Sequence, residues 1–371
     1  MTSLVIPVAV LSQARQAADA FRALTGVTVD AEEVIAGRAT LLGLTPAGRI
    51  SAGGATRLMA SRDGWCALTL SRSDDVDAVP ALVQSDTVGG DPWRTVQRWM
   101  SEHDAADVTA RARLLGLPVA ALGETPAAPP QISRRGSPVS PRTLSTLLVA
   151  DLSAMWAGPL CGQLLARAGA TVVKVESPNR PDGTRAGSVE FFDWMNSGKL
   201  SYAADFDEPT ALRQLLEAAD VVIESSRPAA LARRGIGPAD VAPRDGRVWL
   251  RITGHGTRGE RADWVAFGDD AAVSGGLVRG APADPEFCGD AIADPLTGLH
   301  AALAVAQSLH CGGGELIEVS MAAVAAAYAK APLQAETRCA AMPKPLPSAS
   351  RLGADNAAVD RLVGERRLAA C

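Results

Sequence analysis

Apolar runs and helical segments alternate along the chain from residue 146 onwards. The segments GPLCGQLLARAG and EPTALRQLLEAA have helical spacing, and they separate apolar stretches that read as buried strands. Buried strands joined by helices are typical of a parallel sheet with right-handed crossovers. The pattern therefore predicts an α/β fold with a Rossmann-like domain. The four strands are expected at 146–152 (TLLVADL), 171–177 (TVVKVES), 220–225 (DVVIES) and 247–254 (RVWLRITG).

Ligands of such sheets bind at the carboxyl ends of the strands. The loops that face this edge are expected to begin at Ser153, Ser177, Ser225 and Gly254. We therefore look for functional residues in these four loops.

The first part of the chain has a different pattern. SAGGATRLMASRDGWCALTLS indicates a glycine turn followed by a hairpin around Asp63 and Gly64, and helical segments follow it. LGETPAAPPQISRRGSPVSPR is rich in proline, serine and arginine without apolar periodicity, which is typical of an exposed linker. We predict a small α+β domain over 1–125, a linker over 126–142, a Rossmann-like domain over 143–330 and a C-terminal tail over 331–371.

Composition narrows the classes of partner. The chain has 371 residues, 47% of them hydrophobic, and a net charge of −5, and only 4 of its 36 cationic residues are lysine. Without a basic arm or stripe, nucleic acid is not an expected partner. No window reaches the length of a membrane span and the N-terminal apolar run lacks a basic flank, so we expect a cytoplasmic protein without a membrane partner.

Cysteine and histidine spacing gives no sign of a metal. The six cysteines contain no CxxC pair, and the four histidines show no ligand spacing. We expect reduced thiols and no metal site.

Nucleotide-binding motifs are incomplete. The turn after the first strand reads DLSAMWAGPLCGQLL, in which Gly158 and Gly162 stand four apart and the G-x-G-x-x-G triplet is missing. Glu176 does end the second strand, where a ribose-binding acid would stand. A nicotinamide dehydrogenase is therefore disfavoured, and no P-loop motif is present.

Asp294 is the second residue of the segment ADPLTG, which leads into a long apolar helix. From these residues alone, it is an N-cap that accepts backbone N–H bonds, with Pro295 at the first helical position.

Five motifs in one order resemble the class III CoA-transferases, the relatives of formyl-CoA transferase and α-methylacyl-CoA racemase. They cover residues 147 to about 330: DLSAMWAGPLCGQLLARAGATVVKVESP, DVVIESSRPAALARRGIG, RVWLRITGHG, ADPLTG and GGGELIEVSM. The resemblance implies a homodimer that moves coenzyme A, its co-substrate, between an acyl-CoA and a carboxylic acid. It also implies that Asp294 is the catalytic carboxylate, which would form an aspartyl-CoA intermediate.

Other positions carry over from the resemblance. Ala157 and Gly158 match the first CoA-contacting turn, and Arg233 matches a cation near the CoA phosphates. Many members have Asn-Phe where this chain has Ser225 and Ser226, and a family lysine is replaced by Thr253. These substitutions leave open a CoA-thioester-binding protein without catalytic activity.

The order of the parts departs from the family. GRISAGGATRLMASRDGWCALTL resembles the family's glycine loop and small-domain strands, yet it precedes the Rossmann-like segment, as in a circular permutation or a fusion. Gly53 and Gly54 are the expected members of that loop, where they shape the site or supply oxyanion donors. In AFGDDAAVSGG, Asp269 takes the position of the histidine that the racemases use, which favours transfer over the alternative, racemisation.

Overall fold

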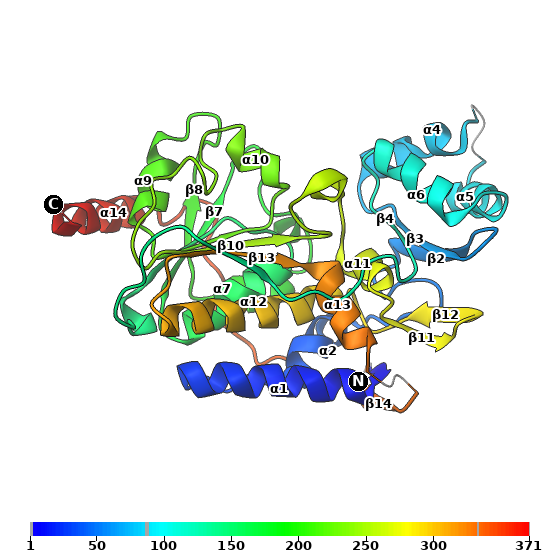
Figure 1. Ribbon diagram of the computed structural model, residues 1–371, viewed down its shortest axis with the longest axis horizontal. Helices are drawn as coiled ribbons and strands as arrows, with labels where there is room; N and C mark the ends of the chain where they lie inside the picture. Colours follow the sequence, from blue (N-terminus) through cyan, green and yellow to red (C-terminus); the bar gives the residue numbers. More distant parts are fainter. Residues whose placement is uncertain (1–2, 86–88, 332–333, 371) are drawn as a thin grey trace.

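The computed structural model describes residues 3–85, 89–331 and 334–370. Its centre is a seven-stranded sheet in the order β5-β13-β10-β9-β6-β7-β8 (Figure 1). Neighbouring strands are parallel except β5, which runs antiparallel to β13. The parallel strands follow the order of a Rossmann fold, so the predicted α/β class is confirmed. They are β6 (Leu148–Asp151), β7 (Thr171–Glu176), β8 (Leu200–Ala203), β9 (Val221–Glu224), β10 (Val248–Thr253) and β13 (Glu315–Ser320), with β5 at Gln131–Arg134.

Helices cover both faces of this sheet (Figure 1). Alternating strand residues point to opposite faces. Val149, Ile223 and Leu250 therefore join the core on the side of α7 and α12, while Leu148 and Val222 join the core on the side of α9 and α14. The helices in this part are α7 (Ala157–Arg167), α8 (Val189–Asn196), α9 (Thr210–Ala218), α10 (Pro228–Ala232), α11 (Gly268–Ser274), α12 (Ala293–His310), α13 (Met321–Ala329) and α14 (Asn356–Ala370), with short 3-10 turns at Leu144–Thr146, Gly183–Ala186 and Gly259–Asp263.

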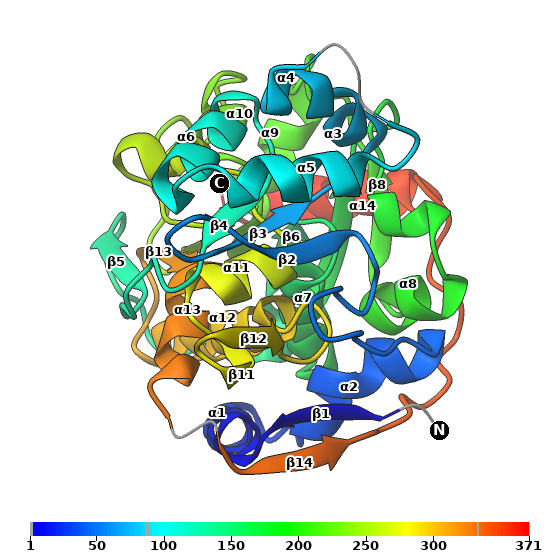
Figure 2. The same ribbon diagram turned by 90° about the vertical axis from the view of Figure 1, so that its right-hand side faces the viewer.

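A separate three-stranded sheet lies at one end of the molecule (Figure 1), and Figure 2 shows it from that end. β2 and β3 pair antiparallel around the turn at Asp63 and Gly64, which confirms the predicted hairpin. The helices α4 to α6 pack on one face of this sheet and enclose its own apolar core. Its elements are β2 (Thr56–Ala60), β3 (Trp65–Thr69), α3 (Ser73–Asp77), α4 (Val79–Val83), α5 (Pro92–Ser101), α6 (Ala105–Leu114) and β4 (Val119–Ala121).

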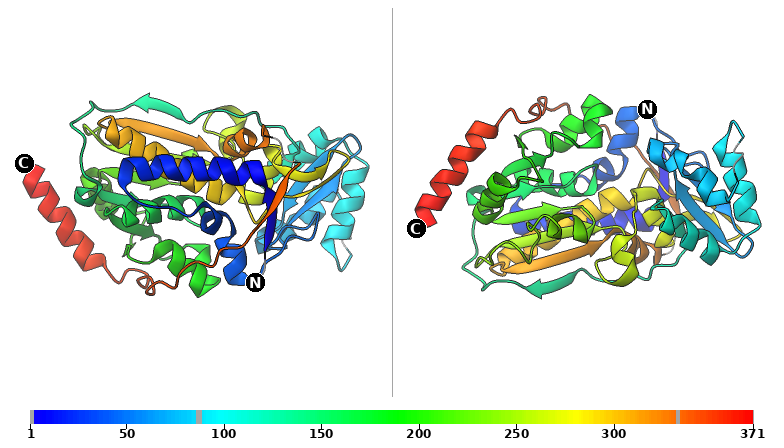
Figure 3. Two further views of the ribbon diagram at one scale, coloured as in Figure 1. Left: turned by 90° about the horizontal axis from the view of Figure 1, so that it is seen from below. Right: turned by 90° about the horizontal axis from the view of Figure 1, so that it is seen from above.

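Residues 3–42 belong to the large core, although they lie within the predicted small domain. Helix α1 (Val8–Thr25) runs alongside α12, and α2 (Ala31–Leu42) packs nearby (Figure 3). Phe21 and Ile35 are fully buried in the same cluster as Leu296. Strand β1 (Leu4–Pro7) pairs with β14 (Glu336–Cys339), which joins the chain start to the segment after α13.

The predicted linker contains a strand. β5 lies within residues 126–142 and forms the antiparallel edge of the large sheet through its pairing with β13. All four of its residues are exposed, as expected for an edge strand without a covering layer. The pattern failed to predict it because a single short edge strand buries too little to need apolar residues.

A short ribbon and the last helix lie outside the two larger sheets. A two-stranded ribbon, β11 (Val278–Ala281) with β12 (Asp284–Phe287), precedes α12. Helix α14 extends from the end opposite the small sheet (Figure 3). Among the described residues, no helix has the length and apolar character needed to cross a membrane.

Gly158 offers a test of how tightly α7 packs on the strand ends. A Cβ built on Gly158 would lie 2.2 Å from the Cβ of Ser153. We expect Gly158→Ala to destabilise the fold by about 1–3 kcal/mol, because overpacking forces backbone shifts. Denaturant unfolding measures this change.

Gly364 is the matched control, since it also lies in a helix, α14, but has no atom within 4 Å of its built Cβ. Gly364→Ala is expected to be neutral or slightly stabilising. Adding Ser153→Gly should recover part of the stability lost in Gly158→Ala. Equal behaviour of the two alanine variants would contradict the packing role of Gly158.

Candidate active site

The carboxyl ends of β6 and β9 meet where the strand order of the sheet reverses. The two strands are neighbours, and the loops that follow them are joined because the Ala154 N–H donates to the Ser225 hydroxyl at 3.2 Å. After β6 the chain turns at Met155, whose φ of 72° is in the left-handed region, and α7 begins at Ala157. Ligands of open α/β sheets bind at such a reversal.

Asp294 lies beside this edge, at the start of α12. The predicted capping role is wrong, because the helix begins one residue earlier, at Ala293, with Ile292 as N-cap and no side-chain capping bond. Pro295 is consequently the third helical residue. The Asp294 carboxyl instead lies against Gly268 at the start of α11, where a built Cβ would be 2.4 Å from its Oδ2 atom.

Burial raises the pKa of Asp294 to about 7. Nearby Arg38 and the backbone N–H of Ala157 act in the opposite direction, and the neighbouring carboxyls of Asp269 and Asp290 raise the pKa further. Desolvation outweighs the favourable partners, so protonation of Asp294 changes near neutral pH.

Two buried aspartates, Asp269 and Asp290, lie near Asp294, and a third, Asp270, lies near Asp269. Burial raises the pKa of Asp269 to about 7 and that of Asp270 to about 8, and it also raises the pKa of Asp290. Asp269 accepts from the Ala291 N–H at 2.9 Å and from the Thr56 hydroxyl at 3.5 Å. These bonds fix Asp269 between the start of α12 and the first strand of the small sheet.

Asp270 connects the small sheet to the same place. Its Oδ1 atom accepts from the Thr69 hydroxyl and from the Phe267 N–H, both at 3.0 Å. The Thr56 and Thr69 hydroxyls are themselves 2.9 Å apart. This chain of bonds holds β2 and β3 against α11.

Arg38 on α2 is the cation of the site. Its Nη1 donates to Asp290 Oδ1 at 2.6 Å, and Asp290 is fully buried. The guanidinium carbon lies 5.5 Å from the ring centroids of both Trp156 and Phe191. Trp156 immediately precedes Ala157, so Arg38 stands over the turn that leads into α7.

The predicted glycine loop lies next to Arg38. A Cβ built on Gly53 would be 3.7 Å from the Arg38 Nη2 atom. Gly54 has a φ of +77°, which favours glycine, and its N–H donates to the Ser51 carbonyl at 2.9 Å. The Gly54 N–H is therefore used within the turn.

The other predicted residues lie at the carboxyl ends of β6, β9 and β10, except Arg233 at the end of α10. Ala157, Gly158 and Ser225 lie at the strand-order reversal, and Ser226 follows directly, within 3.5 Å of Glu224. Thr253 ends the next strand, and its hydroxyl accepts from the Gly256 N–H at 3.0 Å. Arg233 is the exposed C-cap of α10.

Sequence reasoning missed Arg38, Asp270 and Asp290. One available signal was the spacing of Asp290 and Asp294, two acids four residues apart in a segment that is otherwise apolar. Another was Arg38 itself, a lone cation within the apolar run VIAGRATLL. No pattern indicated that these two segments, far apart along the chain, would meet.

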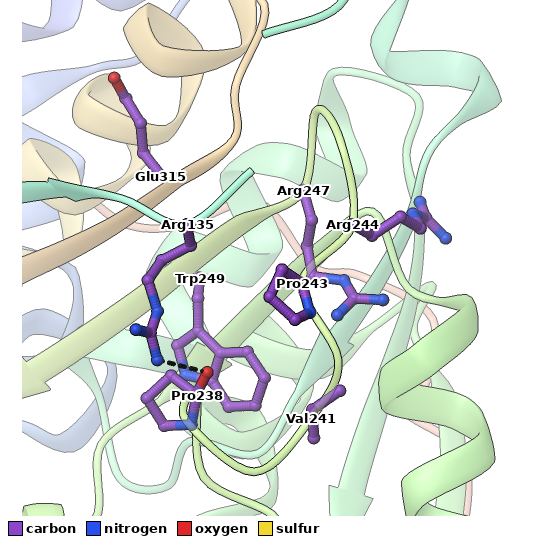
Figure 4. A pocket seen from close by; sticks show the side chains of 8 residues that line it. All are labelled: Arg135, Pro238, Val241, Pro243, Arg244, Arg247, Trp249 and Glu315. Atoms are coloured by element: carbon purple, nitrogen blue, oxygen red, sulfur yellow. Dashed lines mark hydrogen bonds between the residues drawn. The ribbon is translucent and has the colours of Figure 1, made fainter. Parts of the chain in front are cut away.

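The cavity in Figure 4 lies away from this site. It measures about 20 Å³ and is at the amino ends of the strands, since Arg247 precedes β10 and Glu315 opens β13. Arg135 there donates to the Pro238 carbonyl at 2.7 Å. A space of this size holds about one water molecule, so we do not place a substrate in it.

The described part of the chain contains no disulfide and no metal-binding cluster. The cysteines there are free, with Cys66, Cys161, Cys288 and Cys339 buried and Cys311 exposed, while Cys371 lies outside it. No group of three His, Cys, Asp or Glu residues in this part is arranged to hold a metal ion.

Comparison with known proteins supports the resemblance seen in the motifs. The sequence model of CoA-transferase family III matches residues 144–359. A succinyl-CoA–D-citramalate CoA-transferase of Chloroflexus aurantiacus is 32% identical over 199 residues, which cover 49% of this chain and 50% of the relative. A succinate–glutarate CoA-transferase of Agrobacterium fabrum is 32% identical over 204 residues, covering 48% and 50% of the two chains.

The match is partial in length. A crystal structure of a hypothetical protein from Mycobacterium tuberculosis shares 29% identity and a TM-score of 0.45, covering 52% of this chain and 57% of that one. The chain spans about half the length of the two curated relatives. The family model nevertheless covers more than half of the sequence. The chain therefore belongs to CoA-transferase family III.

Proposed function

We propose that the protein is a CoA-transferase in which Asp294 carries CoA between an acyl-CoA and a carboxylic acid. The observation that supports this most strongly is the position of the Asp294 carboxyl. It lies between the starts of α7 and α11, beside the strand-order reversal where Rossmann-like folds bind their ligands. The relatives named above transfer CoA between acids, which agrees with this chemistry.

Transfer requires an intermediate at the energy level of a thioester. The Asp294 carboxylate attacks the acyl carbonyl, expels CoA thiolate and forms a mixed anhydride. The thiolate then attacks the aspartyl carbonyl and releases the donor acid, which leaves an aspartyl-CoA thioester. The acceptor acid reverses these two steps with its own carboxylate.

The CoA itself would lie along the carboxyl ends of the strands. We assign Ala157, Gly158 and Ser225 to the turn nearest Asp294, with Ser226 and Thr253 further along the same edge. Arg233 is exposed and carries a charge suited to the phosphates. Gly53 is the member of the glycine loop closest to the site, and Gly54 holds the loop in its turn.

The racemase alternative fits less well. The resemblance puts Asp269 at the position where the racemases use a histidine as the second base, and Asp269 is held there by bonds from the Ala291 N–H and the Thr56 hydroxyl. An inactive CoA-thioester-binding protein remains the alternative of a different class. The absence of a covalent adduct would favour it.

Asp294→Asn tests the nucleophile. We expect the variant to form no adduct with succinyl-CoA and to lose transfer about a thousandfold or more, since amide nitrogen cannot replace the attacking oxygen. Mass spectrometry of the peptide that contains Asp294 measures the adduct. The same incubation in deuterium oxide tests the racemase alternative, because rapid exchange of the α-proton for deuterium would favour a racemase.

Thermal melting is the control for folding. The pKa of Asp294 is raised by burial above the value of about 3.9 in an unfolded chain. Its contribution to stability is therefore present below about pH 4 and is lost as the pH rises through about 7. Asp294→Asn should melt at or above the wild type at about pH 8. A variant that melts normally and transfers CoA normally would disprove the assignment.

The pH dependence of adduct formation follows from the same pKa. Only ionised Asp294 attacks, so the rate should rise about tenfold per pH unit below about 7 and level off above it. Quenched-flow mass spectrometry between about pH 5 and pH 9 measures this rate. A rate that is constant over the range would contradict the requirement for ionisation.

We also propose that the protein is a homodimer, as the family resemblance implies. Helix α14 extends from the body and leaves Leu368 80% exposed. Light scattering at micromolar concentration should give twice the chain mass of 38.3 kDa. The mass of a single chain would contradict this proposal. The cytoplasmic location stays a prediction.

A further inference from the structure

Arg38 is held in a fixed position above the turn that leads into α7. Its neighbour Gly37 packs so closely on α8 that a built Cβ would lie 2.6 Å from the Trp194 ring. This contact sets the depth of α2, and the Arg38 guanidinium then lies near the rings of Trp156 and Phe191 at 5.5 Å from each. Such stacking orients a guanidinium without using its hydrogen-bond donors.

One edge of the Arg38 guanidinium has no hydrogen-bond partner among the residues that the structure describes. Nη1 donates to Asp290, but Nε and Nη2 make no hydrogen bond to the described part of the chain. The side chain is 23% exposed, and Nη2 faces Gly53 of the glycine loop. The Nε and Nη2 donors form the fork that binds a carboxylate with two parallel bonds.

The surroundings explain why an acid needs such a fork. An incoming carboxylate approaches Asp269 and Asp290, whose negative charges repel it, while Asp294 is a neutral thioester at this stage. Arg38 is the cation that acts on all three of these carboxyls.

Two buried polar atoms beside Arg38 also lack a partner within the described residues. They are Trp156 Nε1 and Asp290 Oδ2, and these two residues are 3% and 0% exposed. Buried polar atoms normally have partners, so their presence next to the free fork is an independent sign of a ligand-binding place.

We propose that Arg38 binds the carboxylate of the acid that accepts CoA, through Nε and Nη2, beside the glycine loop. The inference rests on the proposed transfer function. In the step concerned, one oxygen of the bound carboxylate forms a bond to the Asp294 carbonyl carbon and the C–S bond breaks. CoA leaves as its thiolate, and Arg38 neither gives nor takes a proton.

The experiment separates the two halves of the reaction. The wild type is first incubated with succinyl-CoA, and the CoA adduct on Asp294 is measured by mass spectrometry. The adduct is then challenged with isotopically labelled succinate, or with hydroxylamine, which is an uncharged nucleophile. Succinate is the acid that succinyl-CoA releases when the adduct forms. Because each step is reversible, the same site has to bind succinate when the adduct is converted back into succinyl-CoA.

We expect Arg38→Gln to raise the KM for succinate about ten- to a hundredfold, since charged hydrogen bonds contribute about 1.5–3 kcal/mol. Cleavage of the adduct by hydroxylamine should stay within about twofold of the wild type, because no charge has to be bound. Arg38→Lys keeps the charge but not the fork, so its KM should be intermediate.

Two further variants keep the test decisive. Arg38→Gln leaves buried Asp290 without its cation, which destabilises the fold. The double variant Arg38→Gln/Asp290→Asn removes both charges, so no uncompensated charge is left. Arg49→Gln is the matched control, since Arg49 also pairs with an aspartate, Asp284, and stacks 4.3 Å from a tryptophan ring centroid. It should leave the KM for succinate unchanged.

The outcomes are distinguishable. No adduct in the wild type would overturn the proposed transfer function. An adduct whose cleavage by succinate and by hydroxylamine slows equally in the Arg38 variants would leave transfer intact and overturn the role of Arg38. An unchanged KM for succinate in the double variant would also overturn it.

Discussion

The buried ion pair between Arg38 and Asp290 is the contact on which the geometry of the site depends. It joins residues 252 positions apart and fixes α2 against the segment that leads into α12. Losing one partner of a buried pair leaves the other charge uncompensated, which costs about 3–5 kcal/mol. The helix that carries Asp294 and the helix that carries its neighbouring cation are therefore held in one arrangement.

Burying several carboxyls close together is unfavourable in free energy. Specific features of the fold offset this cost. Gly268 has no Cβ, which allows the Asp294 carboxyl to lie against the backbone. Asp269 and Asp270 accept hydroxyl and backbone bonds that come partly from the hairpin of the small sheet. Thr56 and Thr69 thus stabilise two acids that lie about 200 residues further along the chain. The site is therefore completed by segments that lie far apart along the chain.

The sequence predicted the features that depend on local pattern. The strands before Ser153 and Ser225, the hairpin at Asp63 and the family motif at Asp294 are each recognisable within a short window. The exact start of the Asp294 helix could not be predicted, because helix boundaries depend on backbone packing that the sequence does not display. The structure places Asp294 at the second position of this helix. Family membership came from several motifs in order, and no single motif would have been sufficient.

The features that depend on long-range packing could not be predicted. Arg38 reaches Asp290 only because α2 packs on α8 through Gly37, and β5 exists only because β13 offers it an edge. Residues 1–125 were predicted to form the small domain, because the segment before its strands adjoins them, but burial of Phe21 and Ile35 places residues 3–42 in the large core. Contacts between distant segments are set by the whole core, and a local window contains no information about them.

The central claim is that Asp294 forms covalent bonds with both acids in turn. The most direct measurement is transfer of heavy oxygen from an acceptor acid labelled in its carboxylate with oxygen-18. In the anhydride mechanism, the bridging oxygen comes from the acceptor and stays with the aspartate when CoA thiolate attacks the acceptor's carbonyl. After turnover, mass spectrometry should find heavy oxygen in the side chain of Asp294. Transfer of CoA at a normal rate with no heavy oxygen in Asp294 would contradict the account.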